Sequence, residues 1–427
     1  MIVCEVHKKM LIRWLIVCAM LLVSPYTLLL LIPFFAYNLF TKKYNRLDIL
    51  LLYFLSYLIF NSLALLEGLA NVRYLLIAIV VTDVLFKKNN KSIRDRTLIS
   101  FLFIFLVYIL FNIIFVSFIK EHSFFQYLQF VILILFTFIS TNFNNISEFK
   151  YNFDNVYNLY IVILIMSVFS LMIPSISFGR NGIGFQGITL HPNAFGVFFS
   201  GFTALSFILY VYKNKMINLL FFLVSLTLLF FSQSRTSFLS VILGLAIYFL
   251  LTADFRKKIS KSILLIVPTA SLFLIVFYEK ISTFLFSFLV KNNNNNTIIS
   301  SIESSRGALI EAQIKNIEEN TFFGIGFKVP SSKILQTIDE SNIIKYEKGN
   351  LFLACIEELG IIGFILFITI IIFLIFHKNM YNKVFIILPL VLFITTFGES
   401  TLFSIGGLGT FIWTMMFLNR KNNYKPI

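Results

Sequence analysis

Long apolar runs, separated by short polar connections, make up most of the chain. Runs such as Leu98–Phe118, Val156–Phe178 and Ile263–Tyr278 approach or reach the ~20 apolar residues that a helix needs to cross a bilayer core. A transmembrane barrel would instead show strands of ~10 residues with alternating apolar positions, and the sequence lacks that pattern. The apolar runs therefore predict an all-α, polytopic helical membrane protein.

Two of the apolar runs are too long for one span each. Leu11–Phe40 contains two prolines, which favour two short spans with a turn near Ser24-Pro25, and Val384–Leu418 divides around Gly398. Counted this way, the chain has about 14 transmembrane helices, with 12 or 13 as alternatives. Both chain ends then lie on the same side, and residues 1–427 form a single integral membrane domain.

One long polar stretch, Ile281–Asn350 (residues 281–350), interrupts the apolar pattern. Within it, Ser304-Ser305 can cap a helix that runs to about Glu319. One face of that helix, at helical spacing, holds Arg306, Ile310, Gln313 and Ile317. The spacing indicates a short helix that rests on the membrane bundle with Arg306 beside an apolar stripe, whereas composition alone favours a surface helix whose Arg306 is solvated.

The positive charge of the chain is distributed as membrane insertion requires. The formal net charge is +15, with 58% hydrophobic and 13% charged residues. Of the 35 Lys and Arg, 23 fall in segments that we place in the cytoplasm: the N-terminus, Thr41–Arg46, Lys87–Arg96, Asn142–Asn155, Tyr212–Lys215, Asp254–Lys261, His377–Lys383 and the C-terminal tail. This bias predicts a multi-pass membrane protein with residues 281–350 facing outward, to the periplasm or to the cell exterior, and argues against nucleic acid as a partner.

The cysteines and the N-terminal apolar run do not indicate a functional site. Cys4, Cys18 and Cys355 have no paired spacing, so neither a disulfide framework nor a zinc site is expected. The sequence shows no convincing metal-ligand cluster, and we expect no metal and no cofactor. The first apolar run lacks a small-residue cleavage site, which favours a retained membrane segment over a signal peptide.

On the predicted outward side, a glycine-rich connection containing Arg180 leads to His191-Pro192-Asn193 at the start of a span. Pro192 suits the first helical turn, where its missing N–H has no cost. His191 would then lie at the mouth of the helix. The alternative is an ordinary loop and helix cap without a role in chemistry.

Arg235 lies between two apolar runs that have almost no loop between them, within Ser232–Ser237. It is expected at the outward N-terminus of the following helix, where free N–H groups favour anions. Its planar guanidinium fits phosphate oxygens with two bonds. The alternative is an arginine that extends to the membrane interface.

Three acidic residues also fall on the predicted outward side. Glu357 and Glu358 lie in the first turns of a span that follows Gly349-Asn350, and Glu399 lies in a later outward turn. Acids in such positions are costly if they face lipid. We expect them to line a cavity or to sit shallow enough to meet water.

These pieces, in this order, resemble the bacterial O-antigen polymerase and O-antigen ligase superfamily over about Arg180–Gly363. The resemblance is carried by His191-Pro192-Asn193, Ser234-Arg235-Thr236, Ser305-Arg306-Gly307-Ala308-Leu309, Gly324-Ile325-Gly326, Gly349-Asn350-Leu351-Phe352-Leu353 and Glu358-Leu359-Gly360. The family implies a metal-independent membrane glycosyltransferase whose donor is a glycan on an undecaprenyl pyrophosphate carrier. By position, Arg235 and Arg306 would hold the pyrophosphate.

The resemblance also implies further site residues and leaves the general base open. Substrate-binding residues would be Arg180, Arg235, Arg306, Asn193 and Asn350, and candidates for the base are His191, Glu357, Glu358 and Glu399. Ligases of this group usually carry a His where this chain has Gly349, which favours a polymerase of lipid-linked repeat units. A ligase that transfers glycan to a lipid A-core or a protein, and a flippase of lipid-linked glycans, are the alternatives. A chain-length regulator is a conceivable partner of the polymerase.

Overall fold

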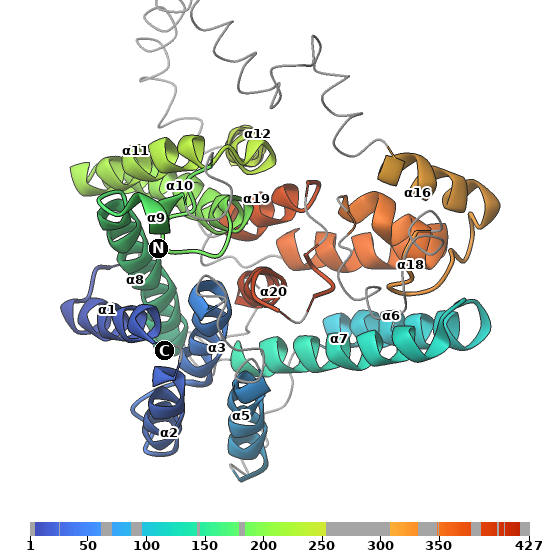
Figure 1. The fold of residues 1–427 in the computed structure, drawn as a ribbon, viewed down its shortest axis with the longest axis horizontal. Helices are drawn as coiled ribbons and strands as arrows, with labels where there is room; N and C mark the ends of the chain where they lie inside the picture. The colour runs from blue at the N-terminus through green and yellow to red at the C-terminus, as the bar shows by residue number, and fades with distance from the viewer. Residues whose placement is uncertain are drawn as a thin grey trace, which may run out of the picture.

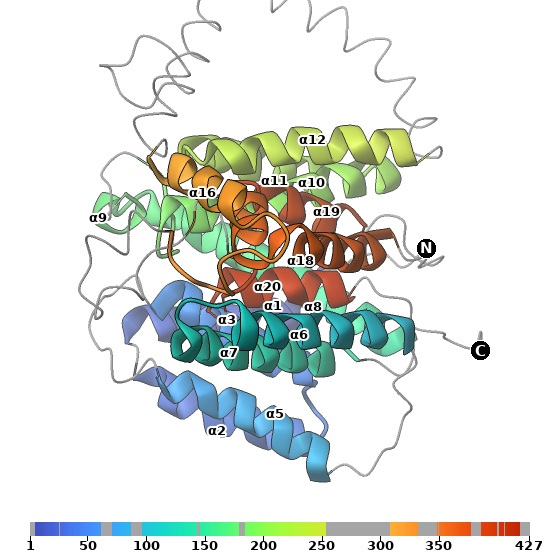
Figure 2. The same cartoon turned by 90° about the vertical axis from the view of Figure 1, so that its right-hand side faces the viewer.

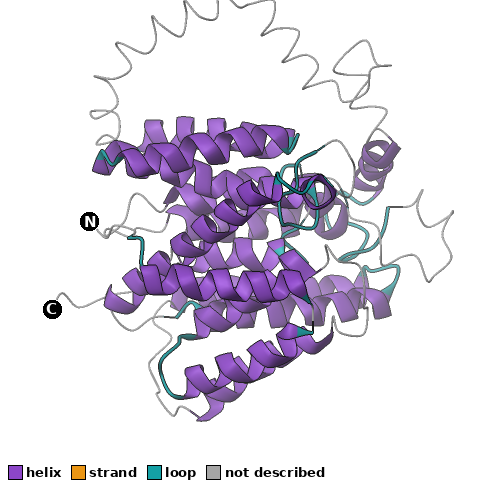
Figure 3. Cartoon of the chain, turned by 60° about the vertical axis from the view of Figure 1, so that its left-hand side comes forward, coloured by secondary structure: helices purple, strands orange, loops and turns teal. Residues whose placement is uncertain are grey.

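The apolar runs of the sequence form helices in the computed structural model, which describes residues 5–24, 26–60, 71–86, 96–142, 146–178, 184–252, 308–331, 348, 350–376, 386–398, 401–404 and 406–418. The elements are α1 (Lys8–Val23), α2 (Thr27–Phe40), α3 (Arg46–Phe60), η2 (Asn71–Arg73), α5 (Tyr74–Phe86), α6 (Arg96–Phe115), α7 (Lys120–Ser140), α8 (Ile146–Ser170), α9 (Pro174–Ser177), α10 (Pro192–Lys213), α11 (Met216–Phe231), α12 (Arg235–Leu251), α16 (Ala308–Glu319), α18 (Leu351–Phe376), α19 (Ile387–Thr395) and α20 (Leu408–Leu418). Every regular element in these ranges is helical (Figure 3). This confirms the predicted fold class.

Five of the described helices, namely α6, α7, α8, α10 and α18, are long and apolar enough to cross a membrane. Both predicted divisions are confirmed, because α1 ends at Val23 before α2 begins at Thr27, and α19 ends at Thr395 before α20 begins at Leu408. The predicted span Ile263–Tyr278 lies outside the described residues.

The helices form a layered bundle around α20 (Figures 1 and 2). α10, α11 and α12 lie together in one layer, α6 and α7 lie side by side in another, and α20 lies between them. Every residue from Gly409 to Leu418 is buried. Phe411 of α20 stacks on Phe54 of α3 at 4.6 Å between ring centroids and lies 5.0 Å from Phe198 of α10. Aromatic contacts of this kind join helices that are far apart in the sequence.

One expected connection lies largely within a helix. Asn142–Asn155 was expected as a cytoplasmic segment between spans, and its residues from Ile146 onward belong to α8. Asp154 and Asn155 are buried. Asn155 accepts a hydrogen bond from the Trp14 indole at 2.6 Å and donates to Asp48 at 2.7 Å. These polar side chains therefore remain in a helix because partners on α1 and α3 satisfy their hydrogen bonds.

Candidate functional site

The segment before α10 and the turn between α11 and α12 meet where α10 and α12 begin. The backbone N–H of Phe185 donates to the carbonyl of Phe231 at 2.9 Å, which ties the segment before α10 to the end of α11. A side chain at Gly196 would collide with Ser234 and Ser237, so glycine allows α10 and α12 to approach closely. We call this end of the bundle, which contains Arg235 and His191, the cavity end.

Arg235 is the first residue of α12, as the sequence predicts. The preceding turn is tight, since α11 ends at Phe231 and Gln233 adopts a left-handed backbone with φ of 54°. The Arg235 side chain is partly exposed. Among the described residues it has neither a carboxylate nor a hydrogen-bond partner, so its charge is available to an anion at the helix N-terminus.

His191 is the N-cap of α10 and Pro192 is the first helical residue, which confirms the expected helix mouth. The Nδ1 atom of His191 accepts the backbone N–H of Asn193 at 3.1 Å. A neutral imidazole that accepts at Nδ1 carries its proton on Nε2. In this arrangement the His191 ring is a hydrogen-bond acceptor at Nδ1 and a donor at Nε2.

A cavity of about 520 Å³ opens beside the start of α10. Its walls come from the ends of α3 and α10 and from the segment before α20; they include Tyr57, Leu58, His191, Asn193, Thr401, Ser404, Gly406 and Gly407. The volume is in the range of pockets that hold small ligands. Two predicted site residues, His191 and Asn193, therefore share one cavity, and Arg235 lies at the same end of the bundle without lining it.

Tyr57 and Arg73 are cavity-end residues that the sequence analysis did not select. The Arg73 guanidinium lies over the Tyr57 ring at 4.7 Å from its centroid, and Arg73 is buried. Tyr57 in turn lines the cavity. Arg73 could have been selected because it is one of the few cations outside the predicted cytoplasmic segments. Its contact with Tyr57, sixteen residues earlier in the chain, does not follow from a sequence pattern.

A second polar cluster fixes the short helix of the long polar stretch, α16, to α18. Glu357 is fully buried and accepts hydrogen bonds from Asn316 Nδ2 at 2.6 Å and from Gln313 Nε2 at 3.3 Å. The Lys348 ammonium lies 2.7 Å from Glu357 Oε2 and 3.3 Å from Glu358 Oε1. The expectation that α16 rests on the bundle with Gln313 facing inward is confirmed.

The backbone of the long polar stretch also enters this contact. Ile325 N–H donates to the Glu357 carbonyl at 2.8 Å, and Lys328 N–H donates to the Glu358 carboxylate at 2.8 Å. Gly360 permits the close approach, because its φ of 67° bends α18 and a side chain there would meet the backbone of Phe322. Phe327 then packs against Phe403 in the segment before α20, with 5.6 Å between the ring centroids.

The remaining predicted site residues divide into two groups. Asn350 caps α18, since its side-chain oxygen accepts the N–H of Phe352 at 2.9 Å, and Glu358 is held by Lys348. Glu358 does not line the cavity that His191 lines. Arg180, Arg306 and Glu399 lie outside the described residues, as do Gly349 and the predicted cap Ser304-Ser305.

Residues 220–368 match the family described as O-antigen ligase. The matched segment contains Arg235, α16 and the Glu357–Lys348 contact. Over this segment the chain is similar to the O-antigen ligase and polymerase superfamily. No curated protein matches the chain. The superfamily consists of glycosyltransferase-like enzymes, and this agrees with a cavity whose polar groups lie at one end of a helical membrane bundle.

Proposed function

We propose that this protein polymerises lipid-linked oligosaccharide repeat units into a surface polysaccharide, such as the O-antigen of lipopolysaccharide or a capsule. The observation that carries the proposal is Arg235, which begins α12 without a described carboxylate partner and lies at the same end as the 520 Å³ cavity. The donor would be a growing glycan on undecaprenyl pyrophosphate, and the acceptor a new lipid-linked unit.

The proposed reaction is a glycosyl transfer without a metal ion. A bond forms between the anomeric carbon of the donor glycan and a hydroxyl oxygen of the acceptor, the bond from that carbon to the pyrophosphate oxygen breaks, and the hydroxyl proton passes to a general base. Negative charge grows on the departing pyrophosphate. Arg235, and by resemblance Arg306 and Arg180, would stabilise that charge. The leaving group needs cations rather than an acid, which suits an arginine at a helix N-terminus.

His191 would serve in this scheme as a hydrogen-bond donor to an oxygen of the donor or acceptor. Its Nδ1 accepts the Asn193 N–H, so the ring donates through Nε2–H. Asn193 lines the same cavity and would bind glycan hydroxyls. Glu358 is neutralised by Lys348, and we assign it to positioning α16. The general base remains unassigned, with Glu399 still a candidate.

The proposed setting is the bacterial inner membrane, with the cavity end facing outward. The sequence bias of Lys and Arg supports this orientation. It would give the cavity access to lipid-linked units in the outer leaflet, and a chain-length regulator would act on the same membrane face.

A ligase is the second candidate, because the matched family is described as O-antigen ligase. A ligase would use the same donor and the same arginines but would transfer the finished glycan to a lipid A-core or a protein. The two activities differ in the acceptor alone. Gly349, where related ligases usually carry a His, supports the polymerase.

Deletion of the gene separates the candidates. If the protein is a polymerase, gel electrophoresis of surface glycans should show a single repeat unit in place of a ladder, restored by a plasmid copy. If it is a ligase, full-length polymer should accumulate on the carrier lipid. Accumulation of single units on the cytoplasmic side would indicate a flippase, and a normal ladder would refute the proposal.

A further inference from the structure

A second cavity, of about 470 Å³, lies beside the first turns of α1. Its lining contains His7, Lys8, Lys9 and Arg13 from the N-terminal segment, Tyr44 before α3, and Tyr151 of α8. Basic and tyrosyl side chains therefore predominate in it. We call this end of the bundle the Arg13 end.

The two cavities lie at opposite ends of the same helices. α3 begins at Arg46, next to Tyr44 of the second cavity, and reaches Tyr57 of the first cavity eleven residues later. A helix rises 1.5 Å per residue, so this separation is roughly 16 Å along the axis. The second cavity is thus distinct from the site proposed for glycosyl transfer.

Positive charge remains in the second cavity after its ion pairs are counted. Arg13 is balanced by the buried Asp48, with Nη2 2.7 Å from Oδ1. Among the described residues, Lys8 and Lys9 form no ion pair, and both side chains are exposed. The Nε–H of Arg13 also has no hydrogen-bond partner in the described ranges. Two unbalanced ammonium groups and an unused guanidinium donor favour an anion.

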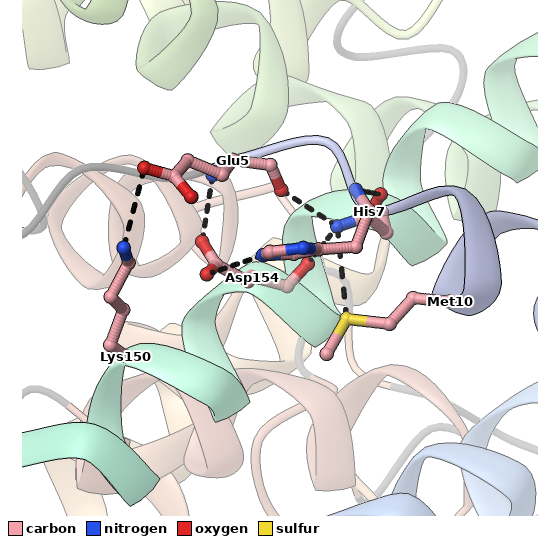
Figure 4. A network of polar contacts seen from close by, with 6 residues as sticks. Glu5, His7, Met10, Lys150 and Asp154 are labelled. Carbon is pink, nitrogen blue, oxygen red and sulfur yellow. Dashed lines mark hydrogen bonds and ion pairs between the residues drawn. The ribbon is translucent and has the colours of Figure 1, made fainter.

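The segment that carries Lys8 and Lys9 is held in place by a polar network with α8 (Figure 4). Glu5 N–H donates to Asp154 Oδ1 at 2.8 Å, His7 Nε2 lies 3.1 Å from Asp154 Oδ2, and His7 N–H donates to Asn158 at 2.9 Å. The hydrogen bond from Lys150 lowers the pKa of Glu5. These contacts hold the start of α1 against α8, so the position of this cavity wall is fixed by hydrogen bonds.

Tyrosine supplies the remaining groups of the cavity. The Arg13 guanidinium stacks on the Tyr44 ring at 4.6 Å from its centroid, and the Tyr151 hydroxyl lies 3.5 Å from Arg13 Nη1. Tyrosines and lysines together are typical of the membrane interface, where an apolar body and a polar tip are both accommodated. The depth and chemistry of the cavity therefore match the level of lipid headgroups.

We infer that the cavity at the Arg13 end binds a phosphate-bearing anion through Lys8 and Lys9, with Arg13 and the two tyrosines as its floor and sides. Ammonium groups and tyrosyl hydroxyls donate hydrogen bonds to phosphate oxygens. The anion could come from an anionic phospholipid headgroup or from a soluble phosphate compound. Anionic lipids are attracted to such basic positions next to membrane spans.

Native mass spectrometry of the full chain tests this inference. The protein is released from nanodiscs made of equal parts phosphatidylglycerol and phosphatidylcholine, and retained lipids are counted. The wild type should retain phosphatidylglycerol preferentially. Lys8→Gln/Lys9→Gln should reduce that preference by about tenfold, and Lys8→Arg/Lys9→Arg should keep it. The matched control is Arg96→Gln/Lys215→Gln, which removes two exposed cations at the same end outside the cavity and should change nothing.

A second arm distinguishes the source of the phosphate. Inorganic pyrophosphate is added to protein in discs of phosphatidylcholine alone, and the thermal unfolding midpoint is measured. A rise in the wild type and the control, but not in Lys8→Gln/Lys9→Gln, would assign the site to a soluble phosphate compound. The inference is overturned if the Lys8→Gln/Lys9→Gln variant behaves like the control in both arms.

Discussion

The two ends of the bundle differ in whether their arginines are paired with carboxylates. At the Arg13 end, Arg13 and Arg46 each meet a buried carboxylate, Asp48 and Asp83, with 2.7 Å between the charged atoms. At the cavity end, Arg235 begins a helix with no carboxylate near it in the described chain. An arginine paired with a buried carboxylate joins helices, whereas an unpaired one at a helix N-terminus is prepared for an anion.

This comparison corrects one part of the sequence argument. All candidate site residues were selected on the predicted outward side. The ion pairs of Arg13 and Arg46 show that polar residues gather at the other end too. The distinction that remains is chemical, because the pairs at the Arg13 end are neutral overall and Arg235 is not.

The largest expected effect is on activity at the cavity end. Arg235→Ala should lower polymer formation by about 10²–10³-fold, because one cation that stabilises the leaving pyrophosphate is removed. Arg235→Lys should recover part of the loss. Polymer length and amount on gels, together with the level of the protein in membranes, provide the measurement.

Arg306→Ala should cause a similar loss if Arg306 joins Arg235 in holding the pyrophosphate. Lys315→Ala is a suitable control, because Lys315 is an exposed cation on α16. Full activity in both arginine variants would refute the pyrophosphate role. A fall in protein level in the membrane, in place of a fall in activity, would show that Arg235 is structural like Arg13.

The second effect is on stability at the Arg13 end. Arg13→Ala leaves Asp48 buried without its partner and should cost about 3–5 kcal/mol in the free energy of unfolding. The thermal unfolding midpoint in detergent should fall, and activity per folded molecule should stay close to that of the wild type.

A double variant sharpens this prediction. Arg13→Met with Asp48→Leu removes both charges, so the midpoint should recover much of the loss caused by Arg13→Ala. If the double variant is less stable than Arg13→Ala, the ion pair is not the source of the effect. If Arg13→Ala abolishes activity at an unchanged midpoint, the contrast between the two ends fails.

The third effect concerns the carboxylates at the cavity end, which resemble the Arg13 end because their charges are paired. Glu357→Gln removes the ion pair with Lys348 but keeps the shape of the side chain. It should cost about 1–3 kcal/mol, and it should loosen α16 from α18. Hydrogen exchange of α16 amides would measure this, with faster exchange expected in the variant.

Glu319→Gln is the matched control on the same helix. Glu319 forms an exposed pair with Lys315 at 4.0 Å, and such pairs contribute about 0.3–0.5 kcal/mol. Exchange in α16 should therefore hardly change. Equal exchange rates in the Glu357→Gln variant and this control would show that Glu357 does not fix α16.

Much of the fold could be predicted because membrane helices follow from the lengths of apolar runs. Prolines and the Gly398 region correctly divided the two longest runs. The start of α8 was missed because Asn152, Asp154 and Asn155 look like a polar loop in sequence. They are buried, and the partners that permit this, such as Trp14 and Asp48, lie more than a hundred residues away.

The candidate site could be predicted where local chemistry decides position. Arg235 and His191 were both placed at helix starts because proline and hydroxyl residues mark such starts. The partners of Glu357 and Glu358 could not be foreseen, since they depend on the close backbone approach of the segment around Gly324 to α18. The Nδ1 bond of His191 is equally invisible in sequence.

The smallest expected effect tests whether the tight turn before Arg235 is strained. Gln233 has φ of 54°, a conformation that costs a non-glycine residue roughly 1–2 kcal/mol. Gln233→Gly should raise the free energy of unfolding by about 0.5–1 kcal/mol, because the greater freedom of glycine in the unfolded chain offsets part of the relief. Gln233→Ala removes the same side chain but keeps the strain, so it should give no gain.

If strain at this turn holds Arg235 in its binding position, Gln233→Gly should also lower activity while stability rises. Equal stability of the two variants would show that the turn is not strained.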